Sequence, residues 1–168
     1  MNAHTTVDSP LGPMLVTSDG QAITGMYFVG QKYGPEDAHC GPADPKAPLL
    51  SKAARQIGEY FCGTREQFAL PLDPRGTPFQ RRVWRALAEI PFGHTLTYGD
   101  IARRIRAPRA VRAVGAAIGR NPISIAVPCH RVIGANGSLT GYAGGLDRKR
   151  ALLDLEARSS SQGREPAR

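Results

Sequence analysis

The chain has 168 residues and a mass of 18.0 kDa, the size of one domain or two small ones. Its 22 Lys and Arg residues against 14 Asp and Glu give a formal charge of +8 and favour a polyanionic partner such as nucleic acid. No apolar run approaches the ~20 residues that cross a bilayer, and residues 1–6 lack the layout of a signal peptide. Composition therefore excludes a membrane protein or a secreted one, and predicts a cytoplasmic location.

The charge is divided unevenly along the chain. Residues 1–75 carry six basic and eight acidic side chains, whereas residues 76–168 carry sixteen and six, a net charge of +10. This asymmetry indicates that the second half of the chain meets the anionic partner.

The three cysteines, Cys40, Cys62 and Cys129, are an odd number without CxxC spacing, which argues against a disulfide framework and a zinc ribbon. The group His4, His39 and Cys40 has no spacing typical of a zinc site. We therefore expect no metal and at least one free thiol.

The N-terminal region predicts a small sheet. Residues 12–18 and 22–29 alternate as strands do, and Asp19-Gly20 between them is a tight-turn signal, which together indicate a hairpin. Residues 30–48 are rich in Gly and Pro without periodicity and predict a surface loop.

A helix should follow over residues 49–61, where apolar side chains recur at helical spacing and Gly63 stands where a helix end favours it. Residues 68–72 predict one more short strand, and residues 73–76 the domain boundary. The sequence thus predicts an α/β domain over residues 1–75.

Beyond the boundary, Thr77 and Pro78 are an N-cap and a first-turn proline for a helix over residues 78–90. A second helix is expected after Thr97, with Asp100 in a capping-box position. The large aromatic side chains of these two regions are assigned to the core: Tyr60, Phe61, Trp84 and Phe92.

A third helix over residues 109–119 completes a helix-turn-helix candidate. A β run at 123–127 and a hairpin centred on Asn136-Gly137 would supply a wing. A last helix opens at Asp147, so the C-terminal domain should span residues 76–158, followed by a disordered polar tail at 159–168.

The chemistry is concentrated at Pro128-Cys129-His130-Arg131. A cysteine beside a histidine in a sharp turn can lose its proton to an imidazole and become a nucleophile. Adjacent side chains do not face one another on a helix or strand, so proton transfer would need a turn or a bridging water. The alternative is that Cys129 is a small buried hydrophobic side chain.

Longer stretches around this tetrapeptide resemble one family. They are Asn121–Gly134, Gly141–Leu146 and Arg148–Leu153, with Thr77–Gln80, Gly93–Tyr98 and Arg112–Gly115 upstream. The chain resembles the O6-alkylguanine-DNA alkyltransferases, or methylated-DNA–protein-cysteine methyltransferases, of the bacterial stand-alone type. The likeness covers residues 77–157 and is weaker over the N-terminal strands.

The resemblance implies a ribonuclease-H-like N-terminal domain, a winged helix-turn-helix C-terminal domain, and direct-reversal DNA repair. Cys129 would accept an alkyl group from guanine O6, and from thymine O4, in one irreversible turnover without a cofactor. The implied partner is double-stranded DNA containing O6-alkylguanine, bound by a monomer, with cooperative binding along DNA left open.

The same resemblance assigns roles to catalytic residues. His130 would take the thiol proton through a water, Glu156 would orient the imidazole, and Asn121 would brace this network. Tyr98 would donate a hydrogen bond to the departing purine.

Contacts to substrate and DNA are implied as well. The substrate contacts fall on Tyr98, Val132, Tyr142, Ala143 and Lys149, with Ala143 contributing a backbone N–H to guanine O6. The target base must leave the stack to be reached.

Arg112 would fill the space that the extruded base vacates. The small residues Ala113 and Gly115 would let their helix approach the minor groove, beside Tyr98.

Two other functions are consistent with a helix-turn-helix. One is a winged-helix regulator with a redox-active cysteine, which would respond reversibly to oxidants. The other is a relative that only binds alkylated DNA, which the presence of Cys129 with His130 and Glu156 disfavours.

Overall fold

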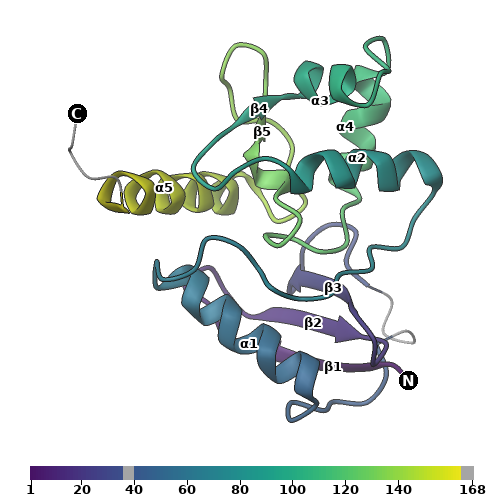
Figure 1. Ribbon diagram of the computed structural model, residues 1–168, viewed down its shortest axis with the longest axis vertical. Helices are drawn as coiled ribbons and strands as arrows, with labels where there is room; N and C mark the ends of the chain where they lie inside the picture. Colours follow the sequence, from purple (N-terminus) through teal and green to yellow (C-terminus); the bar gives the residue numbers. More distant parts are fainter. Residues whose placement is uncertain (36–39, 164–168) are drawn as a thin grey trace.

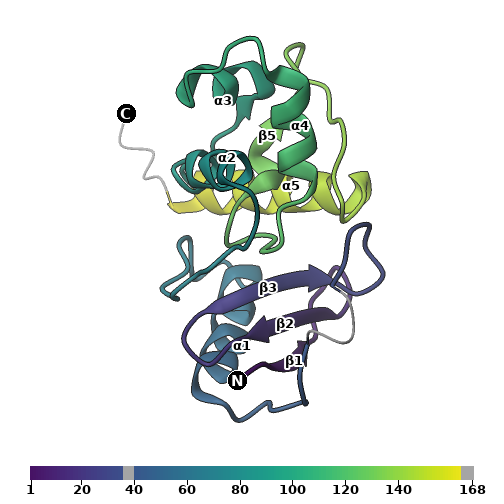
Figure 2. The same ribbon diagram turned by 90° about the vertical axis from the view of Figure 1, so that its right-hand side faces the viewer.

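A computed structural model describes residues 1–35 and 40–163, with side chains as far as residue 159. The N-terminal half holds β1 (Ala3–Val7), β2 (Met14–Ser18) and β3 (Ile23–Phe28) in one antiparallel sheet of order β1-β2-β3. Helix α1 (Pro48–Phe61) covers one face of this sheet (Figure 1). β3 is the strand nearest the C-terminal half (Figure 2).

The expected hairpin is confirmed. The Asp19 carboxylate accepts hydrogen bonds from the backbone N–H of Gln21 at 2.8 Å and of Ala22 at 2.9 Å, which closes the turn. Gly20 adopts φ 93, the left-handed region that glycine enters without strain. Strand β1 was not predicted, because its sequence AHTTV is polar and shows no clear alternation.

Two expected strands, residues 68–72 and 123–127, are wrong. Each makes a single bridge to β3: Leu72 to Ile23 and Ile123 to Met26. Pro71 lies within the first segment, and Pro122 and Pro128 flank the second; a proline lacks the N–H that a ladder requires. In the second segment Ile125 also adopts φ 72, which turns the chain back on itself.

The C-terminal half is mainly helical, as Figures 1 and 2 show. Its elements are α2 (Pro78–Ala88), β4 (Leu96–Thr97), α3 (Tyr98–Arg104), α4 (Val111–Gly119), the 3-10 turn η2 (Cys129–Arg131), β5 (Val132–Ile133) and α5 (Leu146–Gly163). Thr77 with Gln80 and Thr97 with Asp100 form complete capping boxes, which fix the starts of α2 and α3 as the sequence predicts.

The expected wing hairpin is wrong. β4 and β5 pair in parallel through Leu96 and Val132, and Asn136-Gly137 lies in a turn closed by a 2.9 Å bond from Gly134 N to Ser138 O. Among the described residues, β5 pairs with β4 and with no strand that follows the turn, so the turn closes no ladder.

Helix α5 runs to Gly163, beyond the end expected near residue 158. The prediction of a disordered tail is therefore wrong for residues 159–163, and residues 164–168 lie outside the described part.

One hydrophobic core joins the two halves. Tyr60 and Trp84 are buried in it and Phe61 and Phe92 are half-buried against it, as predicted, and the Trp84 indole N–H donates to Ala117 O at 2.8 Å. In the described ranges, no helix has the length and apolar character to cross a membrane. No three potential metal ligands converge among the described residues, and His39 lies outside them.

Candidate active site

Cys129 lies at the start of η2, in a turn that Asn121 holds in place. The Asn121 amide donates to Val127 O at 2.8 Å, and its oxygen accepts from the backbone N–H of Ile123 at 3.0 Å. These bonds satisfy backbone groups of a loop that forms no strand. Asn121 therefore sets the path of the chain that delivers Cys129.

The thiol of Cys129 is buried, with 5% of the residue exposed. Burial raises its pKa to about 11, although a hydrogen bond with Asn121 and the charge of Lys149 act in the opposite direction. At neutral pH the group is a thiol, so it needs a base before it can act as a nucleophile.

His130 is a suitable base. It is fully buried, and its Nε2 lies 2.6 Å from Oε2 of Glu156. Burial lowers the pKa of His130, although the Glu156 carboxylate acts to raise it. Because the net shift is downward, the ring is neutral at neutral pH. The Nε2 proton then points to Glu156, and Nδ1, buried and without a partner among the described residues, is free to accept a proton.

Glu156, on α5, is the centre of a buried polar network. Its Oε1 accepts from Arg131 Nε at 2.8 Å and from Gly93 N at 3.2 Å. Its Oε2 accepts from His130, from Arg131 Nη2 at 3.0 Å and from the Tyr60 hydroxyl at 2.6 Å. Burial alone would raise the pKa of Glu156, but His130 and Arg131 outweigh it and lower the pKa to about 2.

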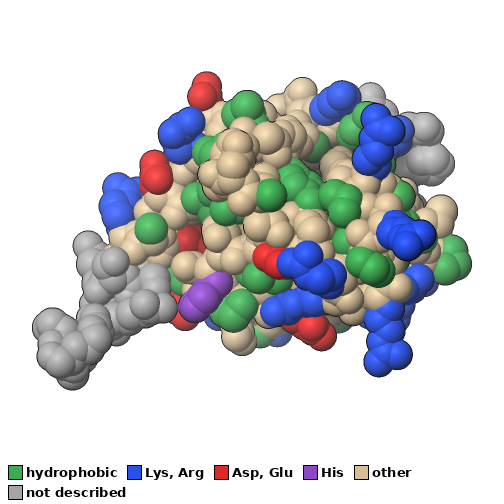
Figure 3. Space-filling model, turned by 90° about the horizontal axis from the view of Figure 1, so that it is seen from above, with side chains coloured by type: hydrophobic (Ala, Val, Ile, Leu, Met, Phe, Trp, Pro, Cys, Tyr) green, Lys and Arg blue, Asp and Glu red, His purple; other side chains and the backbone are tan. Residues whose placement is uncertain are grey.

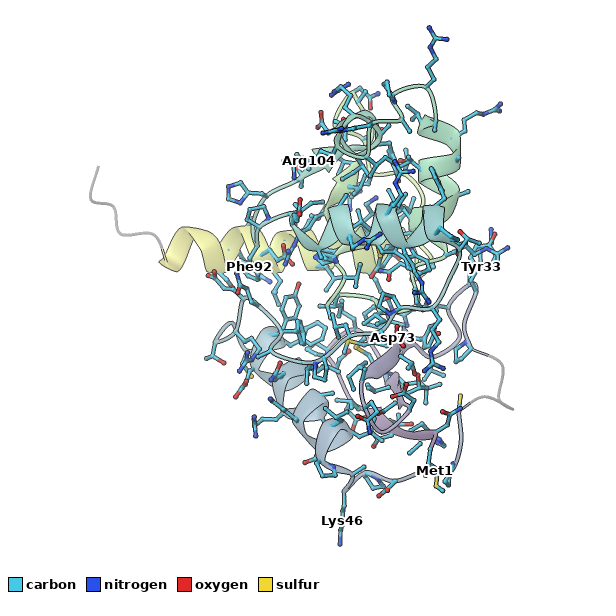
Figure 4. The ribbon with its side chains drawn as sticks, turned by 45° about the vertical axis from the view of Figure 1, so that its right-hand side comes forward. Met1, Tyr33, Lys46, Asp73, Phe92 and Arg104 are labelled. Atoms are coloured by element: carbon cyan, nitrogen blue, oxygen red, sulfur yellow. The ribbon has the colours of Figure 1, made fainter. Side chains whose placement is uncertain are left out.

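A pocket of about 380 Å³ opens between the loop before α5, helix α4 and the loop after β3. Four residues with predicted roles line it: Tyr98, Gly115, Tyr142 and Ala143. Tyr33, from the N-terminal half, also lines it and lies where the two halves approach each other (Figure 4). Cys129, Val132 and Lys149, which were also assigned to the site, do not line it.

Those three residues lie close by, beneath the surface. Val132 is fully buried in β5, next to η2. Lys149 is fully buried, and its ammonium group donates to Thr140 O at 2.8 Å. Burial lowers the pKa of Lys149 to about 8, while Cys129 acts to raise it.

Two tyrosines connect the pocket to these buried groups. The Tyr98 hydroxyl donates to Thr140 O at 3.0 Å, the same oxygen that Lys149 binds. Burial raises the pKa of Tyr142 well above its usual value, and the nearby Cys129 adds to this rise. The Tyr142 phenol therefore stays protonated at neutral pH.

Helix α4 presents small residues on its outer face. Arg112 and Ala113 are exposed, whereas Val114, Ala117 and Ile118 are buried. A Cβ at Gly115 would lie 3.9 Å from the Tyr98 ring, so this face continues into the pocket wall. Figure 3 views this end of the molecule and shows basic side chains spread across it.

The network contains residues that sequence reasoning did not assign to it. Arg131 is part of the motif itself, and its bidentate contact with Glu156 could have been suspected from that position. Tyr60 and Glu156 are 96 positions apart, and no local pattern links them. Lys32 and Tyr33, on the pocket rim, fall in a loop without periodicity.

The fold and the site together define a class: a helix-turn-helix module with a buried cysteine next in sequence to a buried histidine. Comparison with known families identifies the two halves. Residues 2–74 match the 6-O-methylguanine DNA methyltransferase ribonuclease-like domain, and residues 78–158 match the DNA-binding domain of the same family. The chain belongs to the 6-O-methylguanine DNA methyltransferase family.

Individual relatives agree. A methylated-DNA–protein-cysteine methyltransferase of Mycobacterium tuberculosis is 53% identical over 153 residues, which cover 91% of each chain. One of Haemophilus influenzae is 46% identical over 154 residues, covering 91% of this chain and 85% of the relative. A crystal structure of Mycobacterium tuberculosis OGT in complex with DNA has a TM-score of 0.87 at 50% identity and covers 94% of both chains.

Proposed function

We propose that this chain repairs alkylated DNA by direct reversal, as a methylated-DNA–protein-cysteine methyltransferase. It transfers the alkyl group from O6 of guanine, or O4 of thymine, to Sγ of Cys129, once per molecule and without a cofactor. The observation that carries the proposal is the buried Cys129 thiol next in sequence to a neutral His130 whose Nδ1 is free to accept a proton. The relatives' names support the substrate class.

The transfer is an in-line displacement. The thiol proton of Cys129 passes through a bridging water to His130 Nδ1 as the sulfur attacks the alkyl carbon. The S–C bond forms while the C–O6 bond breaks, and the bonding electrons move onto the guanine. Glu156 stabilises the resulting imidazolium, and the Tyr98 hydroxyl donates to the departing purine. The thioether has no route back to thiol, so each molecule acts once.

The alkyl group can reach the buried thiol only if the base leaves the duplex. We propose that α4 enters the minor groove along its small outer face, Ala113 and Gly115, and that Arg112 occupies the vacated stack. The extruded guanine would then enter the pocket lined by Tyr142 and Ala143. There the Ala143 N–H meets O6.

Buried groups support the wall of this pocket. Lys149 holds the carbonyl of Thr140, and Val132 packs beneath the turn that carries Cys129. Both would act on the substrate through this wall rather than by touching it.

The two halves of the chain have different proposed roles. Residues 76–158 would form the domain that holds thiol and DNA surface, and residues 1–75 a domain that supports it. We place the protein as a monomer in the cytoplasm, the compartment that holds bacterial DNA.

A redox-regulated transcription factor is the rival function. Redox-sensing cysteines have low pKa values and are accessible. Cys129 is 5% exposed, and burial raises its pKa to about 11. These properties fit a thiol protected until the substrate arrives.

The test is to incubate the protein with one equivalent of a duplex oligonucleotide containing O6-methylguanine and to measure its intact mass. We expect one added methyl group, located on Cys129 by peptide mapping, and no consumption of a second equivalent. Multiple turnover, or a methyl group on Cys40 or Cys62, would contradict the proposal.

A further inference from the structure

Tyr60 joins the N-terminal half directly to the site. It lies on α1, is fully buried, and its hydroxyl donates to Glu156 Oε2 at 2.6 Å. Its ring is surrounded by Phe61, Phe68 and Phe92, with ring centroids 5.3, 5.8 and 6.1 Å away. This aromatic packing fixes the ring without help from the hydroxyl, so the hydroxyl contact is a separate feature that needs its own explanation.

The oxygen that Tyr60 binds is the one that orients the histidine. Oε2 of Glu156 accepts from Tyr60, from His130 Nε2 and from Arg131 Nη2, whereas Oε1 accepts from Arg131 Nε and from the Gly93 N–H. Burial and the charge of Glu156 raise the pKa of Tyr60 far above its usual value. The phenol therefore stays protonated, and it is a permanent donor to that oxygen.

We propose that Tyr60 is a positioning residue for the alkyl transfer: its hydroxyl fixes the Glu156 carboxylate so that His130 keeps its Nε2 proton on Glu156 and its Nδ1 free for the proton of Cys129. This inference rests on the proposed function. It gives the N-terminal half a role in the chemistry, because α1 supplies one of the five hydrogen bonds that Glu156 accepts.

Removal of the Tyr60 hydroxyl should shift the pH dependence of the rate in a predictable direction. The carboxylate would share its charge with one donor fewer, so Glu156 would be easier to protonate and His130⁺ would be held more strongly. Both changes move the acid limb of the rate profile to higher pH. The other groups that face the pair are Arg131 from η2, Lys149 from α5 and Tyr142 from the preceding loop, and the substitution leaves all three in place.

The experiment compares Tyr60→Phe with the wild-type protein in single-turnover reactions, using free O6-benzylguanine and duplex DNA containing O6-methylguanine. The end point of alkylation counts folded, reactive molecules, while the rate constant reports their reactivity. We expect an unchanged end point and an acid limb moved to higher pH. The rate constant should fall by about tenfold on both substrates, because one hydrogen bond to a charged group is lost.

Tyr27→Phe is the matched control, because Tyr27 is a buried tyrosine of the same half that faces Cys40 and not Glu156. It should change neither the rate constant nor the pH profile. A second pair of variants tests the route of the effect. In a Glu156→Gln background, adding Tyr60→Phe should change the rate constant by less than about twofold, since residues that act through one contact are not additive.

Each outcome decides the matter. If Tyr60→Phe lowers the end point and thermal stability but leaves the rate constant and the acid limb unchanged, Tyr60 only packs, and the proposal is overturned. Full additivity with Glu156→Gln would overturn it too. A wild-type protein that takes up no alkyl group would instead contradict the proposed function, so the two failures are distinguishable.

Discussion

Glu156 and Arg112 lie in the same half of the chain in opposite surroundings. Glu156 is 1% exposed and accepts five hydrogen bonds, whereas Arg112 is exposed and has no hydrogen bond or ion pair with any described residue. In the proposed mechanism, Glu156 is thus fixed before the substrate arrives, which avoids a reorganisation cost during the reaction. Arg112, the group we propose to meet DNA, is free to move into the base stack.

The two regions, the buried site around Glu156 and the exposed face of α4 around Arg112, are linked through Tyr98. Its ring lies against Gly115 of α4, and its hydroxyl shares the Thr140 carbonyl with Lys149. This contact places the DNA face and the pocket wall side by side. Variants on either side of Tyr98 should therefore separate base extrusion from bond formation, and the predictions below test that separation.

The largest effect is expected for Cys129→Ser. Alkyl transfer should fall by at least about a thousandfold, because a hydroxyl is a far weaker nucleophile than a thiol. Affinity for duplex DNA should stay close to that of the wild-type protein, since α4 is untouched. Intact mass and equilibrium binding measure the two quantities. A parallel loss of affinity would show that the two regions are not separable.

Glu156→Gln should slow transfer about a hundredfold, at the lower end of the range for general acid–base groups. The amide cannot fix the His130 tautomer as the carboxylate does. The slowing should be the same for free O6-benzylguanine and for duplex DNA in single-turnover measurements. Asp154→Asn, on an exposed position of the same helix, is the matched control and should react normally.

Glu156 should also govern acid stability. Its pKa is lowered from 4.5 to about 2 on folding, so its contribution is fully present above pH 4.5 and is lost as the pH falls toward 2. The contribution is on the order of 3 kcal/mol. The free energy of unfolding of the wild-type protein, measured with denaturant, should fall across this window. The difference in this free energy between the wild-type protein and Glu156→Gln should shrink over the same pH range. A constant difference from pH 7 to 2 would refute this.

Added salt should weaken DNA binding by the exposed region, whether or not the duplex is alkylated. Affinity for alkylated and for intact duplex should fall at least about tenfold between 50 and 200 mM salt, since phosphate contacts dominate binding. Filter binding or fluorescence anisotropy checks this. Reaction of free O6-benzylguanine should hardly respond, and an affinity indifferent to salt would remove the case for a basic DNA face.

The sequence predicted correctly those features that depend on neighbouring residues alone, such as helix starts and tight turns. Thr77 and Thr97 start helices where their capping boxes require it, and the turn at Cys129 was expected from the residue pair itself. Residues 123–127 read as a strand but form a turn, because the side chain of Asn121 satisfies their backbone groups and Ile125 adopts a left-handed φ. No local rule contains that information.

Contacts between distant segments were out of reach for the same reason. Tyr60 was correctly assigned to the core by its place on an apolar stripe, yet its hydroxyl bond to Glu156 depends on the packing of α1 against the C-terminal half. A periodic pattern predicts which face is buried and not which polar atom it meets.

The separation of the two regions is the central claim, and the ratio of two rate constants tests it most directly. Single-turnover rates on duplex DNA containing O6-methylguanine and on free O6-benzylguanine should be measured for Arg112→Ala and Glu156→Gln. Arg112→Ala should slow the duplex reaction roughly tenfold and the free-base reaction less than about twofold, because only the duplex pays for an unstacked base. Glu156→Gln should leave the ratio unchanged. Equal slowing of both substrates by Arg112→Ala would contradict the account.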